Sequence, residues 1–428
     1  MSHLKFKPES LMMSYGHHAA DAQGAVKAPL YQTSTFAFRS AEEGKAFFEL
    51  AYGLREPQGE ESPGMIYSRL NNPNLDIVEQ RLCLWDNAEE AAVFSSGMAA
   101  ISTVMFEFLH PGDVLLYSSP LYGGTMHFIT EVLAKMGIGA FGFTGEESPE
   151  AVLARLRAEG LDGRVAMVYI ESPANPTNLL TDIEAMSLLA AELSQPSRPV
   201  LTVVDNTYMG PAWQHPLELG ANLVLYSATK YLNGHSDLIA GAVLGNKELM
   251  ERVKIMRTFL GNMASPWASW MLMRSLETLS LRMEKQCSNA RLVAQFLNNH
   301  PLVERVNYLG LLTEEDGEQY DIYRRQCTAP GAMISIYIKG GENEAFAFLN
   351  GLKLFKLAVS LGSTESLAQH PATMTHAGLP TEVLESLGVN GQLVRLSIGI
   401  EHPDDLILDL NQALAGVEMA LEEALANW

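Results

Sequence analysis

Short runs of apolar residues alternate with amphipathic stretches through the middle of the chain. The runs are AAVF, VLLYSS, AFGFT, VAMVYIES, VLTVVDN, LVLYSATK and AGAVLG, between residues 91 and 245. They lack regular polar alternation, which is typical of strands buried on both faces of a sheet. Helix-periodic stretches such as GTMHFITEVLAKM and DIEAMSLLAAELS lie between them. This alternation predicts an α/β domain with a largely parallel sheet and right-handed crossovers.

The segments on either side follow other patterns. Up to about residue 70 the chain is irregular, with one short helix expected after a capping box at Ser40 and a loop rich in Pro, Gly and Glu over 55–64. A long helical stretch over 268–299 leads into strand candidates at 332–340, 356–362 and 393–401 and a closing helix over 404–428. We therefore expect an N-terminal arm over 1–70, a large domain over 71–265 and a small α+β domain over 266–428.

Composition and charge narrow the class of protein. Hydrophobic residues make up 47% of the 428 residues, which is typical of a globular chain, and the first residues lack an apolar core of signal-peptide length. The longest apolar window, 91–109, is interrupted by serines and a glutamate and does not predict a membrane span. A net charge of −21 disfavours nucleic acid and anionic membranes as partners. Three widely spaced cysteines favour a reducing, cytoplasmic location.

Polar side chains gather at the ends of four predicted strands. One run ends at Lys230, which is unusual because burying an amine is costly and lowers its pKa. The other ends carry groups that can bind a ligand, namely Asp205 and Asn206, Glu171 and Ser172, and Gly97 at the start of a helix. In open α/β sheets ligands bind at the carboxyl ends of the strands. The four ends therefore predict one binding site.

These groups match the needs of pyridoxal phosphate. The amine of Lys230 would hold the aldehyde as a Schiff base, and Asp205 would keep the pyridine nitrogen protonated, which makes the ring an electron sink. Tyr122, in SPLYGGT, could stack on the ring. The phosphate would be held by the backbone N–H groups of Gly97 and Met98 at the helix start and by the hydroxyls of Ser227 and Thr229.

Ten motifs follow one another along nearly the whole chain. They are PLYQTSTFAF, YSRLNNPN, FSSGMAAI, PLYGGT, ESPANPTN, VVDNTY, YSATKYLNGHSD, SLETLSLRM, AQHPATMTH and LVRLSIGIE. In this order they resemble the Cys/Met-metabolism family of pyridoxal-phosphate enzymes, which includes cystathionine γ-synthase, cystathionine γ-lyase, methionine γ-lyase and the homoserine sulfhydrylases. The resemblance implies an aspartate aminotransferase-like large domain (PLP fold type I) with a mostly parallel seven-stranded sheet, plus a smaller α+β C-terminal domain.

The resemblance also implies catalytic and cofactor-binding roles for matching positions. Lys230 is the Schiff-base residue, and Asp205 pairs with the ring nitrogen. Tyr122 stacks on the ring and shuttles protons, while Asn175 contacts the ring hydroxyl. The resemblance assigns the phosphate to the same four positions that the strand ends suggest, Gly97, Met98, Ser227 and Thr229.

Further implied roles concern the substrate and a second subunit. Arg395 holds the substrate carboxylate with help from Ser360, although its alternating strand pattern alone would also suit a surface arginine. Tyr67 and Arg69 reach the phosphate of a neighbouring subunit. A homotetramer built from dimers that share active sites is therefore expected.

The sequence leaves two reactions of this family open. We expect γ-elimination on a γ-heteroatom-substituted L-amino acid, with γ-replacement on an activated homoserine as the alternative. The chain departs from the usual subgroup residues at three places. Gly124 replaces a cysteine typical of methionine γ-lyases, Val359 replaces a glutamate typical of cystathionine γ-lyases, and Arg257 with Thr258 replaces a Lys–Asp pair of methionine γ-lyases. The sequence therefore matches no subgroup cleanly.

The loop over 55–64 suggests one particular substrate class. Its carboxylates, Glu56, Glu60 and Glu61, would favour a cationic tail such as that of canavanine, although a solvated acidic loop is the simpler explanation. A non-catalytic homologue is a further alternative, which the filled catalytic positions disfavour.

Overall fold

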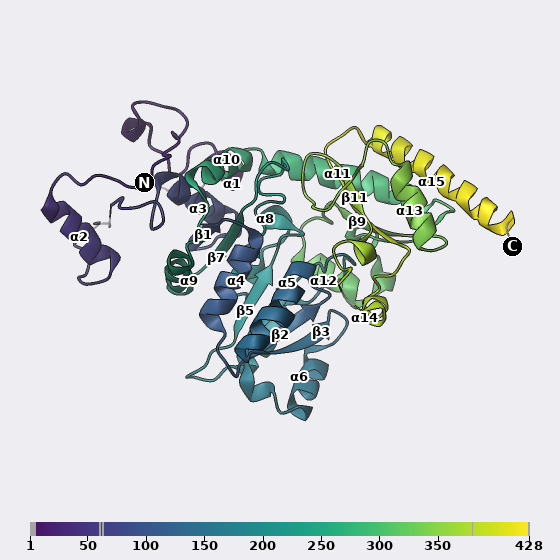
Figure 1. Ribbon diagram of the computed structural model, residues 1–428, viewed down its shortest axis with the longest axis horizontal. Helices are drawn as coiled ribbons and strands as arrows, with labels where there is room; N and C mark the ends of the chain where they lie inside the picture. Colours follow the sequence, from purple (N-terminus) through teal and green to yellow (C-terminus); the bar gives the residue numbers. More distant parts are fainter. Residues whose placement is uncertain (1–5, 60, 62–63, 379, 427–428) are drawn as a thin grey trace.

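The computed structural model describes residues 6–59, 61, 64–378 and 380–426 (Figure 1). Its large sheet has seven strands in the order β1-β7-β6-β5-β4-β2-β3. Only β7 runs antiparallel to its neighbours, β1 and β6, so the prediction of a mostly parallel sheet is confirmed. All seven strands coincide with the predicted apolar runs: β1 (Glu90–Phe94), β2 (Val114–Ser119), β3 (Gly139–Thr144), β4 (Val165–Glu171), β5 (Leu201–Asp205), β6 (Leu223–Tyr226) and β7 (Gly241–Gly245).

Helices cover both faces of this sheet, which explains why its strands are apolar throughout. Leu115 and Met167 point to the face covered by α4 (Gly97–Phe108) and α9 (Lys247–Leu260). The next residues along the same strands, Leu116 and Val168, point to the face covered by α6 (Pro149–Ala158) and α7 (Ile183–Leu193). Further helices of this half of the chain are α3 (Pro73–Asp86), α5 (Gly123–Phe128) and α8 (Gly210–Trp213).

A second sheet lies in the C-terminal part of the chain. Its five strands have the order β10-β11-β12-β9-β8 and pair antiparallel except for β10 and β11. They are β8 (Val303–Asn307), β9 (Met333–Ile338), β10 (Lys356–Leu357), β11 (Leu367–Gln369) and β12 (Leu393–Ser397). The accompanying helices are α10 (Pro266–Leu276), α11 (Leu279–Asn298), α12 (Glu318–Gln326), α13 (Glu342–Gly351), α14 (Thr381–Ser386) and α15 (Pro403–Ala426).

Two predicted elements differ from those observed. The helical stretch expected over 268–299 is two helices, because the chain turns between α10 and α11, where the buried Arg282 guanidinium donates to the carbonyl of Ser275 at 3.1 Å. The strand expected over 356–362 ends at Leu357, since Ser360 adopts φ +104°, which no strand residue adopts. The strands β8 and β11 were not anticipated.

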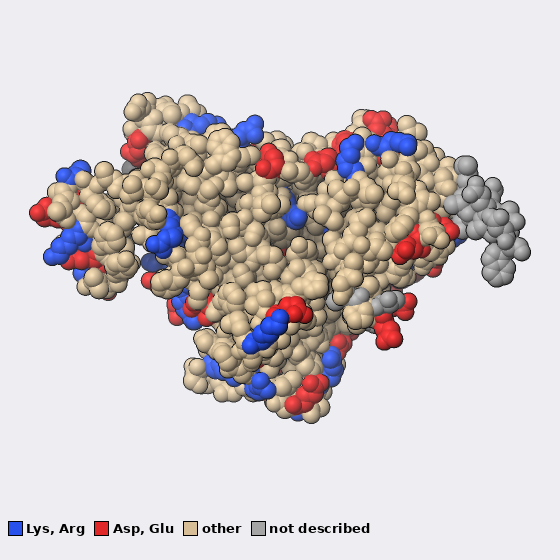
Figure 2. Space-filling model, viewed as in Figure 1, with Lys and Arg blue, Asp and Glu red and all other residues tan. Residues whose placement is uncertain are grey.

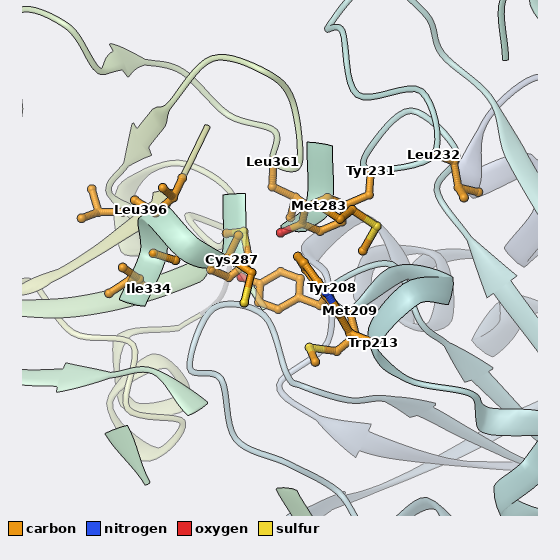
Figure 3. Close-up of a cluster of buried hydrophobic side chains, with 14 of the residues drawn as sticks. Tyr208, Met209, Trp213, Tyr231, Leu232, Met283, Cys287, Ile334, Leu361 and Leu396 are labelled. Atoms are coloured by element: carbon orange, nitrogen blue, oxygen red, sulfur yellow. The ribbon is translucent and has the colours of Figure 1, made fainter. Parts of the chain in front are cut away.

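A buried apolar cluster joins the two sheets beneath the region where the large-sheet strands end. Figure 3 shows Tyr208, Met209 and Trp213 from the large sheet's side facing Met283 and Leu361. The rings of Trp213 and Tyr231 meet edge to face at 5.4 Å between centroids. Tyr231 follows Lys230 and Leu361 follows Ser360, so this cluster fixes the chain immediately after two predicted site residues.

The first part of the chain extends away from both sheets. In Figure 1, α2 (Ala41–Ala51) lies at the far left, on the opposite side of the molecule from α15. The predicted cap is present, because the Ser40 hydroxyl accepts the N–H of Glu43 at 3.2 Å. Val26, Tyr52 and Leu54 of this arm are exposed. The proposed domain boundaries at 70 and 265 stay predictions, and α10, just beyond the second one, packs against α3.

Figure 2 shows acidic and basic side chains interspersed over the face in view. Among the described residues, the search for a helix both long and apolar enough to cross a membrane found none. Cys83, Cys287 and Cys327 are unpaired thiols. The cytoplasmic location stays a prediction.

Candidate active site

A cavity of about 300 Å³ opens at the carboxyl ends of β4, β5 and β6. The strands are parallel here, so their ends bring together side chains that lie far apart in the sequence. Ten of the twelve predicted site residues line this cavity: Gly97, Met98, Tyr122, Asn175, Asp205, Ser227, Thr229, Lys230, Ser360 and Arg395.

Lys230 lies just after β6, with its amine inside the cavity. Its Nζ donates to the Ser360 hydroxyl at 2.8 Å. Burial, and then the nearby positive charge of Arg395, lower the pKa of Lys230 to about 8. A substantial fraction of the amine is therefore neutral near physiological pH, which an amine needs in order to act as a nucleophile or a base.

Asp205 is the last residue of β5 and is held by hydroxyls and a backbone amide. One carboxylate oxygen accepts the hydroxyl of Thr207 at 2.6 Å and its N–H at 3.0 Å. The other accepts the hydroxyl of Tyr169 at 3.3 Å. Burial raises the pKa of Asp205, while the Thr207 and Tyr169 bonds act in the opposite direction. The side chain is thus fixed in place and would be stabilised by a cation beside it.

The start of α4 meets the end of β6 at very close range. A Cβ on Gly97 would lie 2.9 Å from the Cβ of Ser227, so only glycine fits there. Ser96 caps the helix by accepting the N–H of Ala99 at 3.0 Å. The Thr229 hydroxyl donates to the carbonyl of Ala240 at 3.2 Å and accepts its N–H at 3.0 Å, which ties the segment after β6 to the residue before β7. The helix N-terminus therefore faces the cavity with a hydroxyl, that of Ser227, beside it.

Arg395 is buried on β12, which overturns the alternative of a surface arginine. Its Nη1 donates to Asn175 Oδ1 at 2.9 Å and its Nη2 to the carbonyl of Ser360 at 2.7 Å. The Nε atom is buried without a hydrogen-bond partner. Asn175 Oδ1 also accepts the Tyr208 hydroxyl at 3.0 Å. The guanidinium is held rigidly from one side and retains donor capacity toward the cavity.

Tyr122 stands at the cavity with its ring partly exposed. Its backbone N–H donates to Glu171 Oε2 at 2.8 Å. Sequence reasoning placed Glu171 at a strand end but gave it no role. Thr207, Tyr208, Ile239 and Thr375 are among the other cavity-lining residues that it missed. Thr207 and Tyr208 lie in the VVDNTY motif, which was the available signal.

Two predicted site residues lie outside the cavity of their own chain. Tyr67 is 41% exposed, and the Arg69 guanidinium lies 5.8 Å from the Tyr67 ring centroid. Arg69 Nη1 donates to the carbonyl of Thr258 at 3.0 Å. The resemblance assigns both residues to a neighbouring subunit's site, and this assignment stays a prediction.

The positions where the chain departs from its subgroups fall in different places. Val359 lines the cavity, whereas Arg257 is buried and donates to Glu79 at 2.6 Å, away from it. In the acidic loop, Glu61 accepts two hydrogen bonds from Arg55, at 2.7 and 2.8 Å. Glu60 lies outside the described residues.

Comparisons with known proteins agree with this geometry. The family model described as "Cys/Met metabolism PLP-dependent enzyme" matches residues 9–415. A methionine γ-lyase of Pseudomonas deceptionensis is 41% identical over 96% of this chain and 98% of its own length. A cystathionine γ-lyase of Bacillus subtilis is 38% identical over 96% and 100%. The crystal structure of cystathionine γ-synthase from Xanthomonas oryzae pv. oryzae aligns with a TM-score of 0.85 at 33% identity, covering 97% of this chain and 99% of that one.

The match extends over both sheets and almost the full length of each relative. The architecture is that of the fold type I pyridoxal-phosphate enzymes, as expected from the motifs. Lys230, Asp205 and the start of α4 line one cavity. The chain belongs to the Cys/Met metabolism family of PLP-dependent enzymes.

Proposed function

We propose that the chain catalyses γ-elimination on an L-amino acid with a heteroatom on Cγ. Substrate and water would give a 2-oxo acid, ammonia and the protonated leaving group. The observation that carries this proposal is one cavity that joins Lys230, Tyr122 and Arg395. The relatives that are 41% and 38% identical are γ-lyases by name, whereas the synthase structure is 33% identical, which favours elimination over replacement.

The cavity residues fit pyridoxal phosphate. The cradle at Gly97, which a Cβ would fill, leaves the N–H groups at the start of α4 open to a phosphate. The buried Asp205 carboxylate suits a protonated ring nitrogen, and Asn175, whose oxygen is already engaged, keeps its amide N–H groups for a ring oxygen. When bound through Lys230, the cofactor supplies an electron sink that makes the Cα and Cβ hydrogens of the amino acid acidic.

Arg395 and Ser360 would hold the substrate carboxylate. The guanidinium is buried, is fixed by Asn175 and the Ser360 carbonyl, and lines the cavity. These two bonds use two of its five N–H groups, so others remain for a charge-assisted bond to a substrate carboxylate. The amino acid would thereby enter in one orientation, with its Cα toward Lys230.

Lys230 and Tyr122 would move the protons. The lowered pKa of Lys230 makes its amine a base that can accept the Cα proton. Tyr122, partly exposed at the same cavity, would donate a proton to the heteroatom as the Cγ bond breaks. Two different residues would therefore remove the Cα proton and protonate the leaving group.

The cavity lining favours an uncharged tail on the substrate. Ile239 and Val359 both line the cavity and are largely exposed, so they border its entrance. The Glu61 carboxylate is paired with Arg55, so it offers no uncompensated charge to a cationic tail. A thioether, thiol or ester tail is therefore our first candidate, and canavanine, with its cationic tail, is the second.

A substrate panel tests the proposal. Methionine, homocysteine, O-acetylhomoserine and canavanine would each be incubated with the holoenzyme, and 2-oxo acid, ammonia and leaving group quantified. We expect stoichiometric 2-oxobutanoate and ammonia from at least one. Adding a thiol to the O-acetylhomoserine reaction separates the alternatives, because a thioether in place of the keto acid would identify γ-replacement. A preference for canavanine that is lost in Glu56→Gln would restore the acidic-loop hypothesis.

We further propose that active sites are shared between subunits of a homo-oligomer, a tetramer built from two dimers. Tyr67 and Arg69 lie outside their own cavity, and Arg69 carries a charge that no carboxylate among the described residues pairs. Phe259, on α9 next to Thr258, is 78% exposed. An exposed apolar side chain beside an unpaired arginine fits contact with a second copy of this chain.

A further inference from the structure

Glu171 has no role in the reaction outlined above, yet it is one of the residues that line the cavity. It is the last residue of β4, is 5% exposed and lines the cavity. Its Oε2 accepts the backbone N–H of Tyr122 at 2.8 Å, and its Oε1 accepts that of Asn175 at 3.2 Å. One side chain therefore holds the backbone of two proposed site residues.

The two residues it joins come from separate segments. Tyr122 follows β2, whereas Asn175 follows β4 itself. The N–H of Glu171 in turn donates to the Ser118 hydroxyl at the end of β2, at 2.8 Å. Without the Glu171 carboxylate, the Tyr122 segment would lose its hydrogen bond to the end of β4.

Burying a carboxyl group beside a second one costs free energy. Glu171 lies beside Asp205 in the register of the parallel strands β4 and β5, and forms no ion pair with any described residue. Burial, then the Asp205 charge, raise the pKa of Glu171, while the two amides lower it. Of the side chains of this length, only a carboxyl group offers one oxygen to each of two N–H groups, because glutamine presents an NH₂ in place of one of the two oxygens.

We propose that Glu171 is a positioning residue that sets Tyr122 and Asn175 relative to the cofactor by accepting both their backbone N–H groups. This inference rests on the proposed roles of Tyr122 and Asn175 as cofactor contacts. It does not depend on which substrate is turned over, so cofactor binding can test it separately.

Two substitutions distinguish this role from a purely electrostatic one. Glu171→Gln and Glu171→Met both remove the titratable carboxyl group beside Asp205. Glutamine keeps one acceptor oxygen, whereas methionine keeps none. A role through charge predicts equal effects, and a role through the two amides predicts a graded series.

The experiment measures the affinity for pyridoxal phosphate and the visible circular dichroism of the bound cofactor. We expect the Kd to rise from the parent to Glu171→Gln and again to Glu171→Met, on the order of tenfold for each lost acceptor. The dichroic signal should decrease in the same order. For a substrate that the enzyme converts, KM should rise as well, because Asn175 also holds Arg395, the proposed carboxylate-binding residue.

Glu79→Gln is the matched control, because Glu79 is a buried carboxylate that lies outside the cavity. It should lower the Tm without changing the cofactor Kd or dichroism. Equal effects of Gln and Met at position 171, or unchanged cofactor binding in both, would overturn the proposal. Hydrogen exchange of the unmodified holoenzyme gives an independent check if the variants misfold: the amides of 122 and 175 should be protected, and rapid exchange of both contradicts the contact.

Discussion

At the scale of single residues, the site is costly to fold. Lys230 is kept partly neutral by burial and by Arg395, and Arg395 itself has a buried N–H without a partner. The interior holds these groups because neighbouring hydrogen bonds fix them, through Ser360 for the amine and Asn175 for the guanidinium. The free energy of unfolding should therefore reveal the cost of each group.

The first prediction concerns the stability of the cofactor-free protein. The pKa of Lys230 falls from 10.5 to about 8 on folding, so the unfolded chain binds that proton more tightly. Below about pH 8 both states are protonated and the penalty is complete; as pH rises to about 10.5 it disappears. The free energy of unfolding of the parent, relative to Lys230→Met, should rise over this window by about 3 kcal/mol or less.

The free energy of unfolding of both proteins is measured by urea unfolding across that pH window. Other titrating groups are common to the two proteins and cancel in the difference. A difference that stays flat, or that falls with pH, would show that Lys230 is not buried as described.

The second prediction concerns Arg395→Lys. Lysine keeps the charge but cannot maintain the contacts to Asn175 and to the Ser360 carbonyl while presenting a donor to the substrate. We expect KM for the amino acid to rise by about 10- to 100-fold, as expected for the loss of 1.4 to 3 kcal/mol of charge-assisted bonding, with a smaller change in kcat. Steady-state kinetics check this. A fall in kcat at unchanged KM would place Arg395 in the chemistry rather than in substrate binding.

Residue identities at the strand ends could be predicted because their chemistry is unusual for a buried position. Lys230 and Asp205 were found in this way. Glu171 was seen but not interpreted, because its function lies in contacts to the backbone of distant segments. Sequence patterns carry no information about which backbone N–H groups donate hydrogen bonds to a buried carboxylate.

At the scale of secondary structure, α4 and β6 meet where Gly97 contacts Ser227. A third prediction follows for Gly97→Ala. A Cβ would lie 3.1 Å from the Cα of Ser227, so the helix start must shift away from the strand end. We expect the Kd for pyridoxal phosphate to rise about tenfold or more, since the phosphate-binding N–H groups move with the helix.

Gly416→Ala provides the matched control. Gly416 lies in α15, and a Cβ there would meet no atom within 4 Å. Alanine is the better helix former, so the variant should gain about 0.5–1 kcal/mol with unchanged cofactor affinity. Cofactor titration and thermal unfolding of both variants suffice; equal cofactor affinity of Gly97→Ala and the parent would contradict the close approach.

The strands were predicted well and the element ends less well, for physical reasons. Strands buried on both faces are uniformly apolar, and each of the seven large-sheet strands carried that signal. The break between α10 and α11 depends on Arg282 reaching the carbonyl of Ser275, and the early end of β10 depends on the backbone at Ser360. Both are tertiary effects without a local sequence pattern.

At the scale of the whole molecule, the arm and the cavity belong to different parts of the assembly that we propose. The fourth prediction uses this separation. Arg69→Ala and Lys230→Ala should each be nearly inactive alone, because a site would need Lys230 from one chain and Arg69 from another. Mixed after dissociation and reassembly, they should regain activity at about a quarter of the sites, by random pairing in dimers.

Activity of the mixture, normalised to the reassembled parent, is the measurement. A mixture of Lys230→Ala with Lys247→Ala serves as a reference, since Lys247 is an exposed residue outside the cavity. No recovery in the first mixture, with full exchange shown by mass, would place both residues in the same chain's site.

The one reversed strand of the large sheet has a consequence for mutational tolerance. Because β7 runs against its neighbours, its first residue, Gly241, lies opposite Phe94 at the edge where the other strands end. A Cβ there would lie 2.1 Å from the Ser96 carbonyl oxygen and 3.0 Å from Gly97 Cα. In a saturation scan scored by enzyme activity, position 241 should reject all other residues as firmly as position 230, although Gly241 does not line the cavity. Ranking positions by ligand contact would overlook it.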